Sequence, residues 1–270
     1  MSTIPYPSYR LWSTLVFRGV VFAFLVGYVL FILGLLLSLA SHTNSAQFAT
    51  SLVSPETLFS VRLSLITATL SAGASLVIAI PAAYALSRAH FWGKSIVETL
   101  LDLPLVMPPI ALGMALLVFF RTPVGQGIEA TGVRFVFTPL GIVLAQFTLV
   151  STFALRMMKA SFDSIDPRYE KVAQTLGCHQ GAIFWRVTLP LARRGILAAA
   201  VLTWARAVGD FGATVILAGA TAFKTETLPI AIFLNLSTIH IERAIAVTLI
   251  LVGLSLVALL GFRWVGGRGL

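Results

Sequence analysis

Residues 166–190 read D-P-R-Y-E-K-V-A-Q-T-L-G-C-H-Q-G-A-I-F-W-R-V-T-L-P and form a polar interruption between two long apolar segments. Asp166 is a suitable N-cap and Pro167 suits the first helical position, so a short helix is predicted to begin here. The apolar residues of this helix follow the spacing of one stripe: Tyr169, Val172, Ala173 and Leu176. The other faces carry Arg168, Glu170, Lys171 and Gln174. Gly177 is predicted to end the helix, and a loop with this much structure is suited to contact a partner.

The second half of the interruption leads into the next apolar segment. Ile183, Phe184 and Val187 indicate a second short amphipathic turn. Leu189 and Pro190 are then predicted to start a membrane helix, because proline is well tolerated in a first helical turn.

Gly177, nine intervening residues and then Val187-x-Leu189-Pro190 resemble the signature loop of ABC importer permeases, E-A-A-x-x-x-G-x(9)-I-x-L-P. The resemblance implies a cytoplasmic coupling helix that docks into a cleft of a separate ATP-hydrolysing subunit. It places Val172 and Ala173 on the two motif alanines. Lys171 stands where the family usually has glutamate, and Glu170, one residue earlier, could substitute for it. The alternative is an ordinary amphipathic helix lying on the membrane surface.

The composition predicts an integral membrane protein. Hydrophobic residues make up 58% of the chain, charged residues only 11%, and the mean hydropathy is +0.95. A spanning helix needs about 20 mostly apolar residues. Six candidate spans fit this length, at 15–40, 60–86, 98–120, 139–159, 191–217 and 244–264. The first is interpreted as a retained helix and not as a signal peptide.

We divide the chain into three parts. Residues 1–57 hold an N-terminal cytoplasmic tail, the first span and an outer loop, 58–265 form the all-α permease core, and 266–270 are a C-terminal tail. The coupling loop, about 166–190, lies within the core.

The net charge of +9 reflects topology. In the six-span arrangement one side holds only Arg62, Arg121, Arg134, Lys224 and Arg243. Apart from Arg206, which falls inside the fifth span, every other lysine and arginine lies on the opposite side. The positive-inside rule therefore places both termini and the 166–190 loop in the cytoplasm. A nucleic-acid partner is not expected, and Cys178 is expected to be a reduced free thiol.

The third span contains Pro104, Pro108 and Pro109 within six residues. Prolines remove backbone donors, so this helix is predicted to kink or break, and in lipid the freed carbonyls must be buried in protein or line a cavity. A translocation path and a packed structural kink are both compatible with this. The run L-P-x-x-x-P-P also resembles permeases for molybdate, tungstate and sulfate, which favours the path.

The fifth span carries Arg206 and Asp210, four residues apart. On a continuous helix they share one face, and each alone would cost about 2.5–3.5 kcal/mol at the centre of a membrane helix. They are predicted to form a structural ion pair or, alternatively, a polar part of a gate. The stretch A-R-A-V-G-D-F-G-A-T, ending at Thr214, resembles a block of oxyanion ABC permeases.

Before the sixth span, residues 223–233 resemble the K-T-x-T-L-P-x-A-I-[YF] stretch of molybdate and tungstate permeases, which faces the extracytoplasmic side in that family. Lys224 could attract an arriving anion there, although a single exposed lysine is more often only a solubilising residue.

Several activities are excluded. Gly93-Lys94-Ser95 resembles the end of a phosphate-binding loop, but Arg88 stands where its first glycine is required, so the chain is not expected to hydrolyse ATP. The four histidines are far apart in sequence and imply no metal site. Gly209-Asp210 resembles part of an intramembrane aspartyl protease motif, but Ala207 occupies the required glycine position.

The sequence therefore predicts the multi-pass inner-membrane permease subunit of a type I ABC importer for an oxyanion, most consistent with molybdate or tungstate. The resemblance implies a homodimer of this chain, two ATPase subunits that hold ATP and Mg, and an extracytoplasmic binding protein. The chain itself is expected to bind no cofactor. A sulfate or thiosulfate permease is the alternative within this class, and a secondary transporter or channel is the alternative from another class.

Overall fold

The computed structural model describes residues 9–42 and 45–267, and the regular structure in these ranges is helical. Residues 1–8 and 268–270, which belong to the predicted tails, lie outside the described residues, whereas 266 and 267 of the predicted C-terminal tail belong to α13. The elements are α1 (Tyr9–Ser41), α2 (Ser45–Val53), α3 (Pro55–Arg88), α4 (Lys94–Val106), α5 (Pro109–Arg121), α6 (Pro123–Ala130), α7 (Pro139–Asp163), α8 (Arg168–Thr175), α9 (Gln180–Ile183), the π-helical turn η1 (Phe184–Thr188), α10 (Leu189–Val208), α11 (Gly212–Ala218), α12 (Leu228–Ser237) and α13 (Ile241–Gly267).

Within the described residues five helical segments are long and apolar enough to cross a membrane. They are Val16–Ser41 of α1, α3, α7, the run Gln180–Val208 that ends in α10, and Ile241–Gly261 of α13. The pair α4 and α5 counts as a sixth span only if it is taken as one broken segment, because it bends by 108°. The predicted all-α membrane architecture is thus confirmed.

The third predicted span, 98–120, is interrupted in the structure, as its prolines predicted. Met107 and Pro108 adopt extended backbone, with ψ of 136° and 137°, because a residue that precedes a proline is pushed out of the helical region. Pro104 remains inside α4, whereas Pro109 opens α5 in a new direction. The break predicted from the prolines is therefore present and lies at the second and third of them.

The fifth predicted span, 191–217, was wrong as one continuous helix. α10 ends at Val208, and the chain forms a separate short helix, α11, after Gly209, Asp210 and Phe211. Three further short helices, α2, α6 and α12, occupy stretches that were expected to be loops.

The centre of the bundle is the contact of α3 with α7 and α10. The buried face of α3 carries small and hydroxyl side chains: Ser60, Ser64, Thr67, Ala68, Ser71, Ala72, Ser75, Ala79 and Ala83. Such residues let membrane helices approach closely and hydrogen-bond across the contact. Ser71 does so, donating to the Val143 carbonyl at 2.9 Å or to the Gln146 Oε1 at 3.1 Å, while Ser64 accepts the Leu228 N–H of α12 at 2.7 Å.

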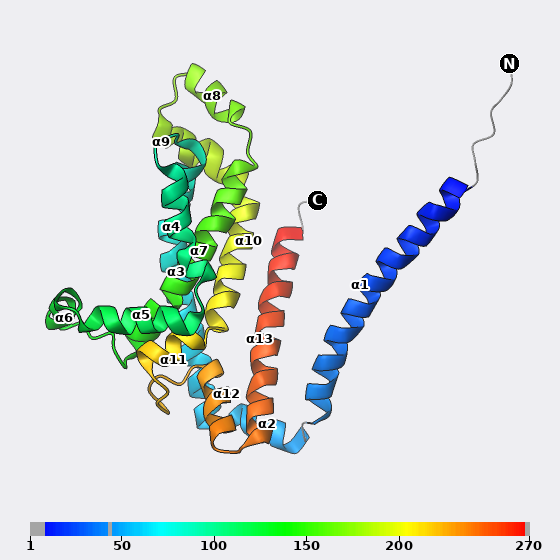
Figure 1. Cartoon of the computed structure of the whole chain (residues 1–270), viewed down its shortest axis with the longest axis vertical. Coiled ribbons are helices and arrows are strands. Elements are labelled where there is room, and N and C mark those ends of the chain that lie inside the picture. Colours follow the sequence, from blue (N-terminus) through cyan, green and yellow to red (C-terminus); the bar gives the residue numbers. More distant parts are fainter. Residues whose placement is uncertain (1–8, 43–44, 268–270) are drawn as a thin grey trace.

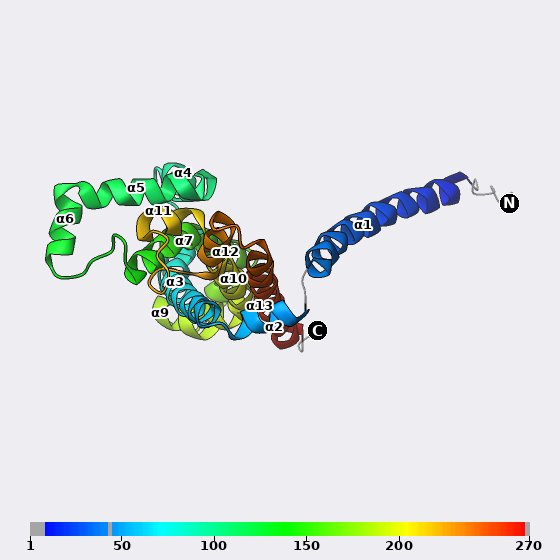
Figure 2. The ribbon, with the colours of Figure 1, turned by 90° about the horizontal axis from the view of Figure 1, so that it is seen from below.

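The arrangement of the helices defines two ends of the molecule (Figure 1). Helices α8 and α9 lie at one end, called here the α8 end, and α2 lies with the start of α13 at the other, called the α2 end. Figure 2 shows that α5 and α6 extend from one side of the bundle, whereas α1 stands apart on the other side. At the α8 end, ion pairs join α4 to α7, between Asp102 and Arg156 and, at 3.7 Å, between Glu98 and Lys159.

Helices α5 and α11 cross at very short range, and glycines make this possible. A Cβ atom at Gly113 would lie 2.7 Å from the Ala213 carbonyl oxygen and 2.9 Å from the Ile216 Cβ. A Cβ at Gly212 would lie 2.9 Å from the Pro109 Cβ. The two broken helices are therefore packed against each other at their breaks.

We expect Gly113→Ala to lower the stability of the protein by about 1–3 kcal/mol, because the added methyl group cannot fit without separating α5 from α11. The matched control is Gly73→Ala in α3, where no atom lies within 4 Å of the new Cβ. Thermal unfolding of the two purified variants in detergent measures the difference. Equal unfolding temperatures of the two variants would contradict the close contact of α5 with α11.

Candidate functional site

The 166–190 loop begins with the predicted short helix, present as α8. The helix starts one residue later than predicted, because Pro167 and not Asp166 is its N-cap, while the Asp166 Oδ1 accepts the Arg168 N–H at 2.9 Å. Its end is stabilised by Gly177, which adopts φ of +83°. The Gly177 N–H donates to the Gln174 carbonyl at 2.9 Å and the Cys178 N–H to the Ala173 carbonyl at 3.1 Å. This pattern is a helix C-cap that requires a left-handed residue, which explains the glycine.

Beyond Gly177 the chain turns into one continuous run that becomes a membrane helix. The His179 Nδ1 accepts the Ala182 N–H at 3.2 Å and caps α9. The π-helical turn η1 then joins α9 to α10, with the Leu189 N–H bonded to the Phe184 carbonyl. A wider turn here makes room for the Pro190 ring, which would clash with a carbonyl in a regular α-helix.

The two faces of α8 differ in chemistry. Tyr169 and Val172 are each 59% exposed and Leu176 is 78% exposed, so three residues of the predicted apolar stripe face outward. Ala173, the fourth, is buried. Lys171 is exposed.

Glu170 departs from the prediction. It was placed on a face away from the apolar stripe and considered as the acidic group that substitutes for the motif glutamate at 171. The structure buries it at 7% exposure against the bundle. Lys171 is therefore the charged residue that α8 presents outward at this point.

Glu170 fixes the loop to the membrane helices. Its Oε1 accepts the Arg88 Nε–H at 3.0 Å and the Thr188 hydroxyl at 2.9 Å, and its Oε2 lies 3.4 Å from the Tyr84 hydroxyl, which donates to it. Arg88 also donates to the Ile165 carbonyl at 3.1 Å. A buried carboxylate is tolerable because an opposite charge and hydrogen bonds compensate its lost hydration. The network joins α8 to the end of α3 and the start of α10.

The base of the loop packs on the core below this network. Ile183 is fully buried, and the Phe184 ring lies 4.8 Å from the Tyr84 ring. Val187 and Leu189 are half-buried, and Pro190 is exposed. The residues of the predicted coupling loop thus form one ordered unit with an apolar outer face.

The predicted pathway residues are brought together only in part. Pro109 and Gly212 are in close contact at the two helix breaks. Asp210 is buried, and its Oδ2 accepts the Thr214 hydroxyl at 2.6 Å and the Thr214 N–H at 3.1 Å. Pro104 lies half-buried inside α4, and Pro108 is exposed.

The predicted ion pair of Arg206 with Asp210 was wrong. The prediction assumed one continuous helix, but α10 ends at Val208, so the two residues do not share a helical face. Arg206 is exposed, and in the described part of the chain the two side chains form no ion pair. The Asp210 carboxylate instead accepts hydrogen bonds from Thr214 in the first turn of α11.

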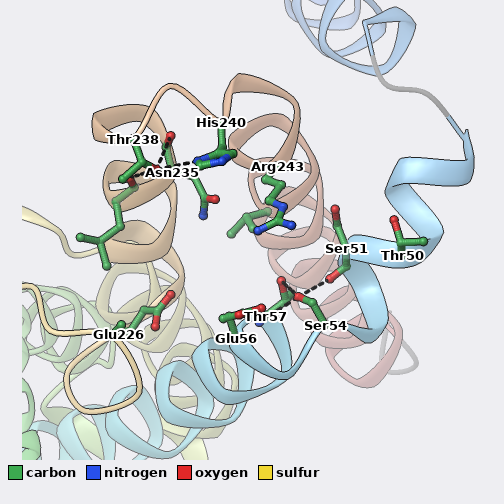
Figure 3. Close-up of a pocket in the computed structure, with 13 residues that line it drawn as sticks. Thr50, Ser51, Ser54, Glu56, Thr57, Glu226, Asn235, Thr238, His240 and Arg243 are labelled. Atoms are coloured by element: carbon green, nitrogen blue, oxygen red, sulfur yellow. Dashed lines mark hydrogen bonds between the residues drawn. The ribbon is translucent and has the colours of Figure 1, made fainter.

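A polar pocket at the α2 end was not predicted from the sequence. It has a volume of about 360 Å³ and lies between α2, the start of α3, α12 and the start of α13 (Figure 3). Its lining includes Glu56, Glu226, His240 and Arg243. Burial raises the pKa of Glu226 above its usual range. Because carboxylates line it together with Arg243, the pocket lacks the purely cationic lining of a fixed oxyanion site.

The residues that sequence reasoning missed are partners of predicted ones. Tyr84, Arg88 and Thr188 hold Glu170, yet Tyr84 and Arg88 precede it by more than 80 positions. The available signal was Arg88, a basic residue at the very end of a long apolar segment.

The helical bundle, its two broken helices and its ordered loop define a multi-pass membrane transport protein. The family model for the inner membrane component of binding-protein-dependent transport systems matches residues 75–268, and the chain belongs to this family.

Relatives agree with this assignment, and a solved structure shares the fold. A probable molybdenum ABC transporter permease protein of Haloferax volcanii is 38% identical over 217 residues, 80% of this chain and 78% of the relative. The molybdate/tungstate transport system permease protein WtpB of Pyrococcus furiosus is 35% identical over 219 residues, 81% of this chain and 82% of the relative. A chain of a bacterial alginate ABC transporter, crystallised with an alginate pentasaccharide-bound periplasmic protein, has the same fold, with a TM-score of 0.76 at 18% identity, covering 96% of this chain and 98% of that chain.

We expect Glu170→Ala to loosen α8, because Arg88 loses the carboxylate that compensates its charge. Removing one partner of a buried pair costs up to about 3 kcal/mol, with the partial exposure of Arg88 reducing this figure. Hydrogen exchange of the α8 amides measures the change, and Lys171→Ala on the exposed face of the same helix is the control. Equal α8 protection in both variants would contradict the anchoring role of Glu170.

Proposed function

We propose that this chain is the translocating subunit of an ATP-driven importer for a tetrahedral oxyanion, and that the 166–190 loop couples it to a separate ATPase. The observation that carries the proposal is the outward apolar stripe of α8. Tyr169, Val172 and Leu176 are exposed on a helix whose other face is fixed by Glu170. A rigid, exposed apolar helix face is suited to insert into a groove of a partner protein.

The α8 end is assigned to the cytoplasm, together with both termini. The support is the distribution of basic residues, since cytoplasmic loops of membrane proteins carry an excess of lysine and arginine. Eight basic residues lie in the 166–190 loop or in the parts of α3, α7 and α10 near the α8 end: Arg88, Arg156, Lys159, Arg168, Lys171, Arg186, Arg193 and Arg194. The ATPase partner, with its ATP and Mg, is accordingly proposed to bind on the α8 side.

A homodimer is the proposed assembly. The most apolar stretch of α1 has none of its residues buried within the chain, and α5 has exposed apolar residues along its length: Ile110, Met114, Val118 and Phe119. A second copy of the chain and surrounding lipid would cover these surfaces. Two copies would present two α8 helices to two ATPase subunits, and the α2 end would receive an extracytoplasmic binding protein.

The translocation path is proposed to run beside the two helix breaks. Non-helical backbone at membrane depth is tolerated where it is buried in protein or lines an aqueous cavity. The breaks at Pro108–Pro109 and Gly209–Phe211 provide such backbone, with Asp210 and Thr214 beside them. Pro104 and Arg206 are proposed to lie at the edges of this path.

The proposed substrate is molybdate or tungstate, with sulfate as the alternative. The support is the names of the relatives from Haloferax volcanii and Pyrococcus furiosus. All three anions are tetrahedral dianions of related shape, so a path with few fixed charges would discriminate weakly between them. Selection is therefore assigned to the binding protein.

Reconstitution in proteoliposomes with the ATPase and binding protein tests the function. We expect ATP-dependent uptake of molybdate and tungstate, with sulfate transported poorly when presented by the same binding protein. Uptake that persists without ATP and stops when an ion gradient is collapsed would indicate a secondary transporter and contradict the proposal. A preference for sulfate would contradict only the substrate.

The same reconstituted system tests the coupling loop. We expect Gly177→Val to insert normally in the membrane but to lose most ATP-driven uptake, because a β-branched residue is strained at a positive φ and would distort the end of α8. Gly177→Asn is the matched control, since asparagine tolerates this conformation. If the valine variant transports and stimulates ATP hydrolysis like the asparagine variant, this loop is not the docking site.

A further inference from the structure

A groove with a strongly cationic lining lies where the 166–190 loop meets the start of α10. Its volume is about 600 Å³. The lining consists of Tyr169, Arg186, Val187, Pro190, Leu191, Arg193 and Arg194. The groove is distinct from the outward stripe of α8 except for Tyr169, which borders both.

The lining contains three guanidinium groups and no carboxylate. Arg186 and Arg193 are exposed, and in the described part of the chain neither forms an ion pair. The carboxylates of the loop are directed elsewhere, since Glu170 is bonded to Arg88 and Asp166 lies beside Arg168. The charges of Arg186 and Arg193 are therefore not neutralised by the carboxylates of this loop.

The chemistry of this lining fits a phosphate group attached to a hydrocarbon chain. Guanidinium groups donate paired hydrogen bonds to phosphate oxygens, and a tyrosine hydroxyl can add another. Val187, Pro190 and Leu191 supply an apolar side to the same groove. Leu191 and Leu197 are exposed along the next turns of α10, the helix that leads into the bilayer. An amphipathic anion would thus meet charge at one end of the groove and apolar side chains towards the membrane.

We propose that this groove binds the phosphate headgroup of an anionic phospholipid, with its acyl chains lying along α10. The lipid would brace the base of the loop, because Tyr169 belongs to α8 and Arg186 to η1, whereas Arg193 and Arg194 belong to α10. The assignment of the groove to the cytoplasmic leaflet rests on the proposed function. The binding itself depends only on the groove.

The test uses the full-length chain alone in detergent, titrated with phosphatidylglycerol or phosphatidylcholine and observed by native mass spectrometry. The double variant Arg186→Gln with Arg193→Gln removes two groove charges. The control variant, Arg18→Gln with Arg168→Gln, removes two exposed charges outside the groove. Inorganic phosphate in a separate titration distinguishes a lipid from a free anion.

We expect the wild-type chain and the control variant to retain phosphatidylglycerol with the same affinity, and the groove variant to bind it about thirtyfold more weakly, at about fivefold per arginine. Phosphatidylcholine should not saturate the site. Equal retention by both variants would mean that the arginines serve topology alone and would overturn the proposal.

Two other outcomes would also overturn it. If inorganic phosphate binds as tightly as the lipid, the groove is a site for free anions. If lipid retention is unaffected but the groove variant fails to assemble with the ATPase, the arginines contact an acidic protein surface. Because the lipid titration contains no ATPase, its failure is distinguishable from failure of the proposed transport function.

Discussion

The buried pairing of Glu170 with Arg88 is the constraint on which the functional end of the molecule depends. A carboxylate at 7% exposure must find compensating donors, and Arg88, Thr188 and Tyr84 supply them from two membrane helices. With Glu170 held inward, Tyr169, Val172 and Leu176 lie on parts of the helix surface that turn away from it, and all three are exposed. The exposed apolar stripe is therefore a direct consequence of an electrostatic anchor on the opposite face.

Helix α3 carries this constraint through the bundle. Arg88 is its last residue, and its first turn is capped by Ser54, which accepts the Thr57 N–H at 3.3 Å beside the pocket of Figure 3. Between these ends its small and hydroxyl side chains pack closely against α7 and α10. Ser71 provides hydrogen bonds across the contact with α7, so α3 and α7 are well suited to move as one body. The loop at one end and the pocket at the other are thus attached to the same helix.

Local signals in the sequence were sufficient where the structure is decided locally. The start of α8 near Asp166, its end at Gly177 and the entry to α10 at Leu189 follow from capping and backbone preferences of neighbouring residues. The membrane architecture and the break at the prolines were also predicted from local composition, whereas the family was predicted from motifs that resemble those of known permeases. The direction of Glu170 was not, because its partner Arg88 lies 82 positions earlier and only the tertiary fold brings them together. The supposed pair of Arg206 and Asp210 failed because a glycine between them ended the helix that the spacing assumed.

The two helix breaks are best understood as one structural feature. Each alone would leave backbone groups without partners in an apolar environment, which is costly. Asp210 satisfies one of them by accepting the Thr214 N–H, and the Met107 N–H still reaches the Leu103 carbonyl. The contact of Gly212 with Pro109 then brings the two irregular segments together, so that each shields the other. Because Glu170 bonds α8 to Thr188 at the start of α10, and α10 ends at this junction, a displacement of α8 is connected through α10 to the place where α4 and α5 change direction.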